Sequence, residues 1–159
     1  MKNRNYDVVF INPGNPHKVY QHLSGEFSAL EPPTYTALVA GALQNMDYDV
    51  ALIDIPARTQ SIEEIAQEVV DMNPALVGIF VYGYQPSAST QNMPAAYEIL
   101  DAIKNLNPKM KIMLSGTHPS ALPFETMDES RADFVCDREG IETTQQLIDC
   151  ISENGNLKD

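Results

Sequence analysis

The chain has 159 residues, a formal net charge of −12, 43% hydrophobic residues and 20% charged residues, as expected of one globular domain. So acidic a surface argues against nucleic acid and against anionic membranes, because both attract basic side chains. No apolar run approaches the roughly 18 residues of a membrane span, and no signal-peptide core precedes the first strand. Two cysteines form no disulfide framework, so we expect a reduced, cytoplasmic protein.

The first half of the chain alternates between strand and helix. Tyr6 to Asn12 (YDVVFIN) is a continuous apolar run, typical of a strand covered on both faces. A helix is predicted from Pro32-Pro33 to Met46, because proline is tolerated at a helix start. Asp49 to Ile55 follows as the second strand. Ser61 and Glu64 form a capping box, which predicts the start of the next helix.

The third strand, Ala75 to Tyr82, is the most hydrophobic and is predicted to lie at the centre of the sheet. A polar loop, Gly83 to Asn92, should separate it from a helix that ends near Asn107-Pro108. The fourth strand is Lys111 to Leu114, and we expect a loop over Gly116 to Pro123.

The last third of the chain predicts a short helix, a fifth strand and a closing helix. These are Phe124 to Glu129, Ala132 to Cys136 and Glu142 to Ile151, with a stop signal at Asn154-Gly155. We therefore expect one domain over residues 1–155, with residues 156–159 as a tail or the start of a linker.

Strands and helices that alternate in this way predict an α/β fold with parallel βαβ units. The expected architecture is a flavodoxin-like (Rossmann-like), doubly wound five-stranded sheet of order 2-1-3-4-5. Its ligand crevice should lie at the carboxyl ends of strands one and three, where the winding reverses. The longest predicted loops fall at this edge, at Pro13 to Glu31, Gly83 to Asn92 and Gly116 to Pro123, and long loops in a small domain are usually functional.

Several known uses of this fold do not match the residues. The first turn, Pro13-Gly14-Asn15-Pro16, lacks the glycine pattern of a dinucleotide site. The acidic residues and lysine of a phosphate-accepting receiver domain are missing from the strand ends. No GxSxG elbow is present, and no base is evident beside the candidate serines, which are Ser24, Ser28, Ser87 and Ser89.

Metal and acid–base sites also find little support. His17 and His22 lie in a polar loop without the close ligand spacing of a zinc site. Two cysteines fourteen positions apart, Cys136 and Cys150, cannot hold an iron–sulfur cluster. The carboxylates after the fifth strand, which include Glu139, fit helix N-terminal acids better than catalytic ones. We therefore predict no metal ligand and no catalytic residue in this chain.

An ordered set of short segments carries a specific resemblance. The set runs from Asn12-Pro13 and Glu31-Pro32-Pro33 through MDYDVALID and PALVGI to NPKMKIMLSGTHPSALPFETM, ADFVCDREGIE and the closing helix. In this order and spacing the segments resemble the N-terminal cobalamin (vitamin B12)-binding domain of cobalamin-dependent radical SAM enzymes. The match covers nearly the whole chain, from about Tyr6 to Ile151. In the family's patterns, glycine and proline stand where this chain has Ser115 and Thr117.

The resemblance implies that cobalamin is the ligand and that the domain binds it without catalysing a reaction alone. A corrin ring is broad and flat, so it needs a wide crevice, and its nucleotide tail needs small residues beside the sheet. Small residues on the first helix, Ala37, Ala40, Gly41 and Ala42, fit such a path, but they fit close helix–sheet packing equally well. The expected cofactor-binding residues are Pro13, Gly14, Tyr82, Gly83, Ser115, Gly116, Thr117, His118, Glu139 and Gly140.

The chain departs from the methionine-synthase type of cobalamin domain, because no DxHxxG motif follows the first strand. The resemblance thus implies base-off cobalamin with no histidine from this domain on cobalt. Phe80 stands where classical domains often place a serine. A radical SAM barrel, with S-adenosylmethionine and a 4Fe-4S cluster, would follow in the parent enzyme, of methyltransferase or cyclase type. The alternative is a flavodoxin-like regulatory or protein-interaction module without a cofactor, for which the aromatic segment FVYGYQPS would be suited.

Overall fold

The computed structural model describes residues 5–14, 32–83 and 86–153, and it contains a five-stranded parallel sheet of order β2-β1-β3-β4-β5. This order confirms the predicted flavodoxin-like topology. The strands are β1 (Tyr6–Asn12), β2 (Val50–Asp54), β3 (Pro74–Val81), β4 (Ile112–Gly116) and β5 (Phe134–Cys136). The predicted stop at Asn154-Gly155 and the tail over residues 156–159 lie outside the described residues.

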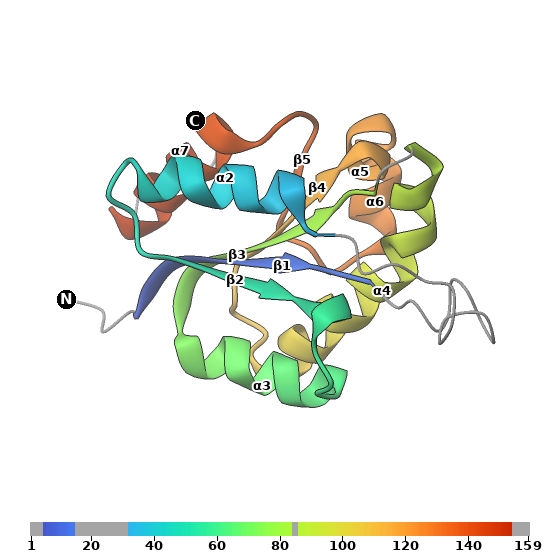
Figure 1. Cartoon of the computed structure of the whole chain (residues 1–159), viewed down its shortest axis with the longest axis horizontal. Coiled ribbons are helices and arrows are strands. Elements are labelled where there is room, and N and C mark those ends of the chain that lie inside the picture. The colour runs from blue at the N-terminus through green and yellow to red at the C-terminus, as the bar shows by residue number, and fades with distance from the viewer. Residues whose placement is uncertain (1–4, 15–31, 84–85, 154–159) are drawn as a thin grey trace.

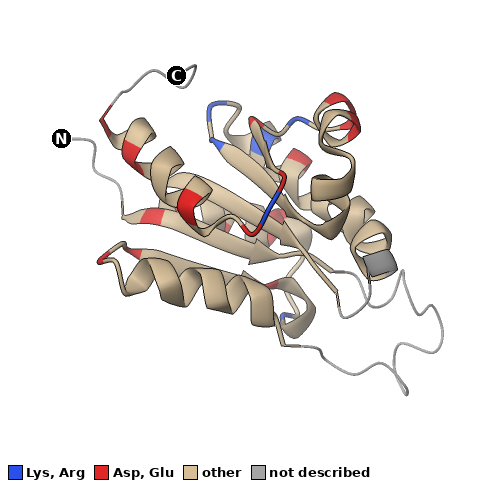
Figure 2. Ribbon diagram, turned by 90° about the horizontal axis from the view of Figure 1, so that it is seen from above, with Lys and Arg blue, Asp and Glu red and all other residues tan. Residues whose placement is uncertain are grey.

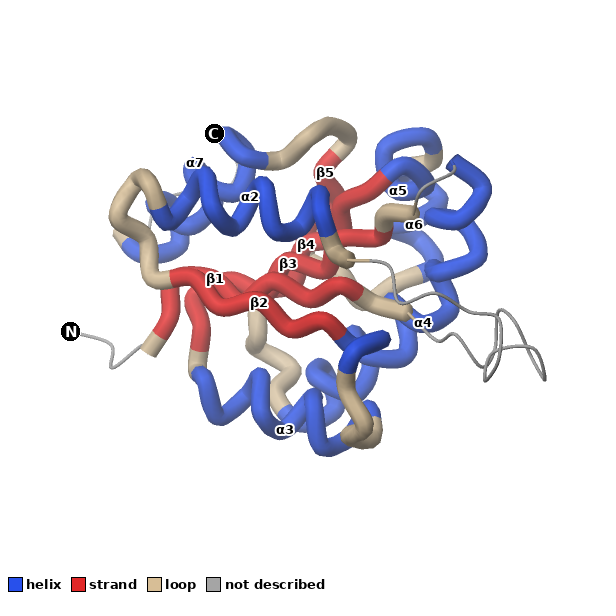
Figure 3. Tube along the Cα trace, viewed as in Figure 1, coloured by secondary structure: helices blue, strands red, loops and turns tan. Residues whose placement is uncertain are grey.

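Helices cover the sheet on both faces (Figure 1). They are α2 (Thr34–Gln44), α3 (Ile62–Met72), α4 (Pro86–Leu106), α5 (Thr117–Ala121), α6 (Pro123–Glu129) and α7 (Ile141–Ser152), with a 3-10 turn, η2, at Ile55–Ala57. Helices α2 and α7 lie on one face of the sheet and α3 and α4 on the other, as Figure 3 shows with helices in blue and strands in red. We call these the α2/α7 face and the α3/α4 face. In the described ranges, no helix combines the length and apolarity that a bilayer crossing requires.

Strand β3 is central and all eight of its residues are buried, as its sequence predicts. Because side chains alternate along a strand, its residues divide between the two faces. Val77, Ile79 and Val81 pack with α3 and α4, whereas Leu76 and Phe80 pack with α2 and α7. This alternation places Tyr82, directly after the strand, on the α2/α7 side with Phe80.

Two predicted loops are wrong. Helix α4 begins at Pro86, within the predicted loop Gly83 to Asn92, and α5 begins at Thr117, within the predicted loop Gly116 to Pro123. Both segments are polar and contain weak helix formers, so local propensity suggested loops. Tertiary contacts favour helices instead: the hydroxyl of Ser89 in α4 donates a hydrogen bond to the Val81 carbonyl at the end of β3.

An ion network secures the opposite, amino-terminal edge of β4 and β5. The Asp133 carboxylate accepts hydrogen bonds from Lys104 Nζ at 2.7 Å, from Lys111 Nζ at 2.8 Å and from the Ile112 amide at 2.9 Å. Burial opposes the charged carboxylate, but these three donors outweigh burial and lower the pKa of Asp133 below its ordinary value. The Lys104 side chain is almost fully buried, so this network fixes α4 against the sheet.

Candidate functional site

All five strands run parallel, so their carboxyl ends and the turns that follow them meet at one edge of the sheet. Three predicted residues come together there on the α2/α7 face. The side chain of Tyr82 lies near that of Ser115, which is fully buried and whose hydroxyl lies 3.5 Å from the Arg138 carbonyl oxygen. A Cβ on Gly140 would lie 3.6 Å from Ser115 Oγ. Burial raises the pKa of Tyr82, and the nearby hydroxyl of Ser115 offsets part of that rise.

Two further predicted glycines allow backbone segments to approach closely at this edge. Gly116 has φ +141°, and a Cβ at this position would overlap the carbonyl oxygen of Val81. A Cβ on Gly83 would overlap the side chain of Ala88 in α4. Only glycine fits at Gly116, so its presence already has a structural cause without a ligand.

The predicted residues Pro13 and Gly14 lie toward the β2 end of the edge. A Cβ on Gly14 would lie 2.7 Å from Pro56 Cγ. Asn12, which directly precedes Pro13, donates a 2.7 Å hydrogen bond from Nδ2 to Asp54 Oδ1 and links β1 to β2. A polar hydrogen bond therefore lies beside Pro13 and Gly14 at the β2 end of this edge.

Thr117 and His118 begin α5, where His118 is turned toward α4. Its Nδ1 lies 3.0 Å from Thr90 Oγ1, and its backbone amide donates a 2.9 Å hydrogen bond to Ser89 Oγ. Because Ser89 also donates to the Val81 carbonyl, its hydroxyl serves as a bridge between β3 and α5. His118 thus contacts α4, whereas Tyr82 and Ser115 lie on the α2/α7 face.

Sequence reasoning missed an aromatic pair at the α2 end of the site. The rings of Tyr35 and Tyr82 are stacked, with centroids 4.6 Å apart and planes 9° apart. Tyr35 stands in the first turn of α2 and is 55% exposed. No pattern within α2 could have shown this stacking, because it depends on Tyr82, a residue that follows β3 and is distant in the chain.

A second missed residue is Thr144 in the first turn of α7. Its side chain is fully buried, and its hydroxyl has no hydrogen-bond partner within the described parts of the chain. The Thr144 amide donates to the carbonyl of Gly140, so the hydroxyl lies one helical turn from that predicted site residue. A buried hydroxyl without a partner is costly unless a ligand or water supplies one.

The α2/α7 face of the site carries an uneven distribution of charge. Helix α2 contains no charged residue, whereas α7 and the loop before it contain several acids (Figure 2). Glu139 is exposed in that loop, directly before Gly140. Of the small residues on α2, Ala40 packs in the core, while a Cβ on Gly41 would meet no atom within 4 Å. Packing of α2 on the sheet therefore does not require glycine at position 41.

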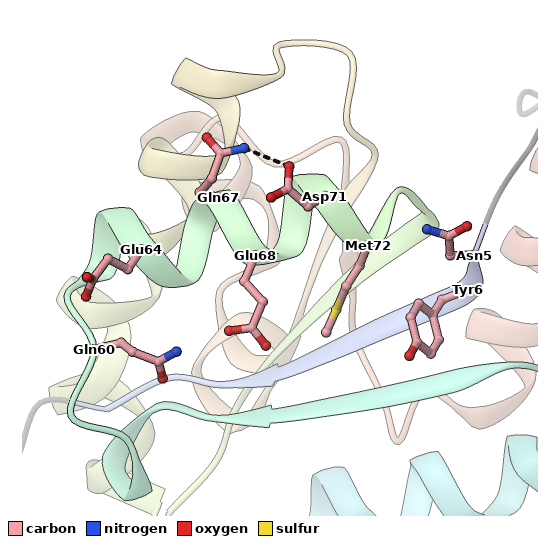
Figure 4. A pocket seen from close by; sticks show the side chains of 8 residues that line it. All are labelled: Asn5, Tyr6, Gln60, Glu64, Gln67, Glu68, Asp71 and Met72. Carbon is pink, nitrogen blue, oxygen red and sulfur yellow. Dashed lines mark hydrogen bonds between the residues drawn. The ribbon is translucent and has the colours of Figure 1, made fainter.

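A groove of about 580 Å³ lies elsewhere, along α3 and the start of β1 (Figure 4). Amide and acidic side chains line it, together with Tyr6 and Met72. Two of the acids have partners: Asp71 accepts from Gln67 at 2.8 Å, and Glu68 pairs with Arg58 at 2.6 Å. The groove shares no residue with the predicted site, so we regard it as a surface feature of the α3/α4 face.

Comparisons with known proteins bear on this site. The family model of the B12-binding domain matches residues 24–148. The uncharacterized methyltransferase PH0819 of Pyrococcus horikoshii is 30% identical over 128 residues, which are 80% of this chain and 26% of that protein.

Solved structures have the same fold. One is the methyltransferase TsrM of Kitasatospora setae, a radical S-adenosylmethionine enzyme solved with cobalamin and a [4Fe-4S] cluster. It matches with a TM-score of 0.70 and 19% identity, and the match covers 96% of this chain and 26% of that chain. The cobalamin-dependent S-adenosylmethionine radical enzyme OxsB matches with a TM-score of 0.63 and 20% identity over 97% of this chain and 20% of its own. The chain thus spans about a quarter of these relatives. It belongs to the B12-binding domain family, as its sequence predicts.

Proposed function

We propose that this domain binds base-off cobalamin at the carboxyl edge of the sheet, with the corrin ring over the turns and the nucleotide tail along the α2/α7 face. Family membership over residues 24–148 is the observation that carries the proposal. The site chemistry supports it, because the buried side chains of the α2/α7 face are uncharged and mainly apolar, as is typical of a cofactor site. The proposed contacts are Pro13, Gly14, Tyr82, Gly83, Ser115, Gly116, Thr117, His118, Glu139 and Gly140.

The proposal includes that no histidine of this domain ligates cobalt. The contact of His118 with Thr90 supports this, because a ring engaged with α4 is directed away from the Tyr82–Ser115 pair. His17 and His22 lie outside the described residues. The departure from the DxHxxG pattern after β1 supports the same view.

We further propose that the parent protein is a cobalamin-dependent radical SAM enzyme of methyltransferase or cyclase type. In it, a C-terminal barrel would bind S-adenosylmethionine and a 4Fe-4S cluster. The likeness to TsrM, solved with cobalamin and a [4Fe-4S] cluster, and to OxsB, a cobalamin-dependent S-adenosylmethionine radical enzyme, supports this proposal. Cobalamin supplies methyl transfer or a change of redox state when bound. The residues of this chain would bind the cofactor, orient it and shield it from solvent, so the domain alone is not catalytic.

Retention of colour tests the binding claim. The purified domain is mixed with hydroxocobalamin and desalted, and its visible spectrum is recorded. Retention near one equivalent supports the proposal. A colourless protein would favour the alternative of a regulatory or interaction module, provided that a version of the chain that includes the following domain is colourless as well.

Electron paramagnetic resonance tests the claim about histidine. In the Co(II) form, the wild-type spectrum should lack nitrogen hyperfine splitting from a protein ligand. The His17→Ala, His22→Ala and His118→Ala variants should give the same spectrum. Nitrogen splitting that disappears in any one of them would assign that histidine to cobalt and overturn the claim.

A further inference from the structure

A graded series of aromatic rings leads from the core to the surface at the proposed site. Phe10 and Phe80 are fully buried and in T-shaped contact, with centroids 5.0 Å apart. The ring centroid of Phe80 lies 6.2 Å from that of the half-buried Tyr82, and the ring of Tyr82 stacks on that of the exposed Tyr35. Tyr82 is thus continuous with fixed core residues, whereas Tyr35 ends the series at the surface.

The two tyrosines are held very differently. Tyr82 directly follows the central strand β3, and its half-buried side chain packs with the buried cluster that contains Phe80. Tyr35 stands in the first turn of α2, a helix without a side-chain N-cap, and 55% of its surface is exposed. The ring of Tyr82 is therefore the fixed member of the pair, and the ring of Tyr35 is the one that a ligand can displace at low cost.

The two tyrosine rings are stacked in the way that a planar aromatic ligand stacks on an aromatic side chain. Parallel rings with centroids 4.6 Å apart fit the stacking of a heteroaromatic base on a phenol ring. Cobalamin carries such a group, a benzimidazole at the end of its nucleotide tail, and in the base-off state this group is free of cobalt. Helix α2 presents no charge that would oppose an uncharged base.

We propose that the benzimidazole of bound cobalamin stacks on the ring of Tyr82, in the position that the ring of Tyr35 occupies in the free domain. Tyr82 is then the stacking platform for the base, and Tyr35 competes with it in the free domain. The inference rests on the proposed cobalamin binding. It adds which residues meet the tail: the Tyr82 ring favours ligands that carry the base, whereas the Tyr35 ring lowers their affinity because it must first be displaced.

Cobalamin and cobinamide separate this inference from the proposed function, because cobinamide has the corrin ring but no nucleotide base. Dissociation constants of both ligands are measured for the wild type, Tyr35→Ala and the control Leu38→Ala. Leu38 lies on the same helix and is 63% exposed, so its removal leaves the stack intact. Loss of the competing ring should tighten cobalamin binding about three- to tenfold in Tyr35→Ala. Cobinamide binding, and both ligands with Leu38→Ala, should be unchanged.

The platform itself is tested with Tyr82→Leu, whose folding is checked by thermal unfolding. This variant should lose several-fold in cobalamin affinity and little in cobinamide affinity. As a direct readout, the ring resonances of Tyr35 in ¹³C-tyrosine-labelled protein should shift when cob(III)alamin is added, since Tyr35 leaves the ring current of Tyr82. Cobinamide should not shift them.

Three outcomes would overturn the inference. Weaker or unchanged cobalamin binding by Tyr35→Ala would mean that the base does not replace this ring. Equal effects on both ligands would mean that the pair contacts the corrin rather than the tail, while the proposed function would stand. Failure of every variant and the wild type to bind either ligand would remove the proposed function and this inference together.

Discussion

The two faces of the sheet are built from different kinds of side chain. On the α3/α4 face, the fully buried cluster consists of aliphatic residues and methionine, and the aromatic rings of Tyr6 and Tyr97 pack only at its margin. The α2/α7 face buries two phenylalanines and a cysteine, and the half-buried Tyr82 and the hydroxyls of Ser115 and Thr144 lie beside them. Aliphatic packing makes a rigid support, whereas aromatic rings and hydroxyls can also recognise a ligand. The contrast indicates that one face holds the fold and the other serves the site.

The largest effect is expected from a cavity on the supporting face. Ile79 is fully buried at the centre of β3 and packs with α3 and α4. Ile79→Ala should lower the free energy of unfolding by about 3 kcal/mol, measured by urea denaturation, because it removes buried methyl groups and leaves a cavity. The ratio of cobalamin to cobinamide affinity should stay unchanged. A changed ratio would show that the two faces are not separate in function.

The ion network at Asp133 should give the next largest effect. Asp133→Asn leaves the buried Lys104 without its counter-ion and should destabilise the domain by about 2 kcal/mol. The exposed Asp101, whose carboxylate lies 3.6 Å from Arg131, is the control, and Asp101→Asn should have almost no effect.

Asp133 also predicts a pH dependence. Its pKa is lowered in the folded protein from an ordinary value near 3.8, so its contribution is present above that value and is lost as the pH falls through the lowered pKa. The wild type should therefore lose stability relative to Asp133→Asn in denaturation series below about pH 4. Parallel curves for the two proteins would contradict this assignment.

Backbone strain on the α2/α7 face is tested at Gly140, which has φ +86°. Gly140→Ala should cost about 1–2 kcal/mol, because a side chain is unfavourable in this conformation. Gly41→Ala is the matched control within α2, where a Cβ meets open space, and it should instead stabilise by up to about 1 kcal/mol. Effects of the same sign in thermal unfolding would refute the role of the positive φ.

The smallest expected effect is a gain in stability at Thr144. Thr144→Val removes a buried hydroxyl without a partner in the described residues and should stabilise the domain by about 1 kcal/mol. Thr126 in α6 is a matched control, since it is equally buried and its hydroxyl also lacks a partner there. Thr126→Val should give a similar gain. Only Thr144→Val should also weaken cobalamin binding; equal affinities for both variants would remove Thr144 from the site.

The strands could be predicted because continuous apolar runs such as Tyr6 to Asn12 fit a buried parallel sheet and little else. The capping box of Ser61 and Glu64 is likewise confirmed by two reciprocal hydrogen bonds of 3.2 and 2.8 Å. The starts of α4 and α5 could not be predicted, because contacts such as that of Ser89 with β3 outweigh weak local helix propensity.

The candidate site shows the same division. Ser115, Tyr82 and Gly140 were predicted from the positions where strands end and from the family resemblance, and they do lie together. Tyr35 and Thr144 were missed, because a tyrosine or threonine within a helix carries no local sign of what its side chain contacts. Whether the site residues touch cobalamin stays a prediction.

By itself, the sequence determined the order of strands and helices and the parallel sheet, because hydrophobic periodicity and turn residues act over a few neighbouring positions. The family followed from the resemblance of an ordered set of short segments. Only the tertiary structure decided that Tyr35 stacks on Tyr82, that His118 is turned toward α4 and that Thr144 is buried without a partner. These features depend on the packing of helices against strands distant in the chain, which no local pattern encodes.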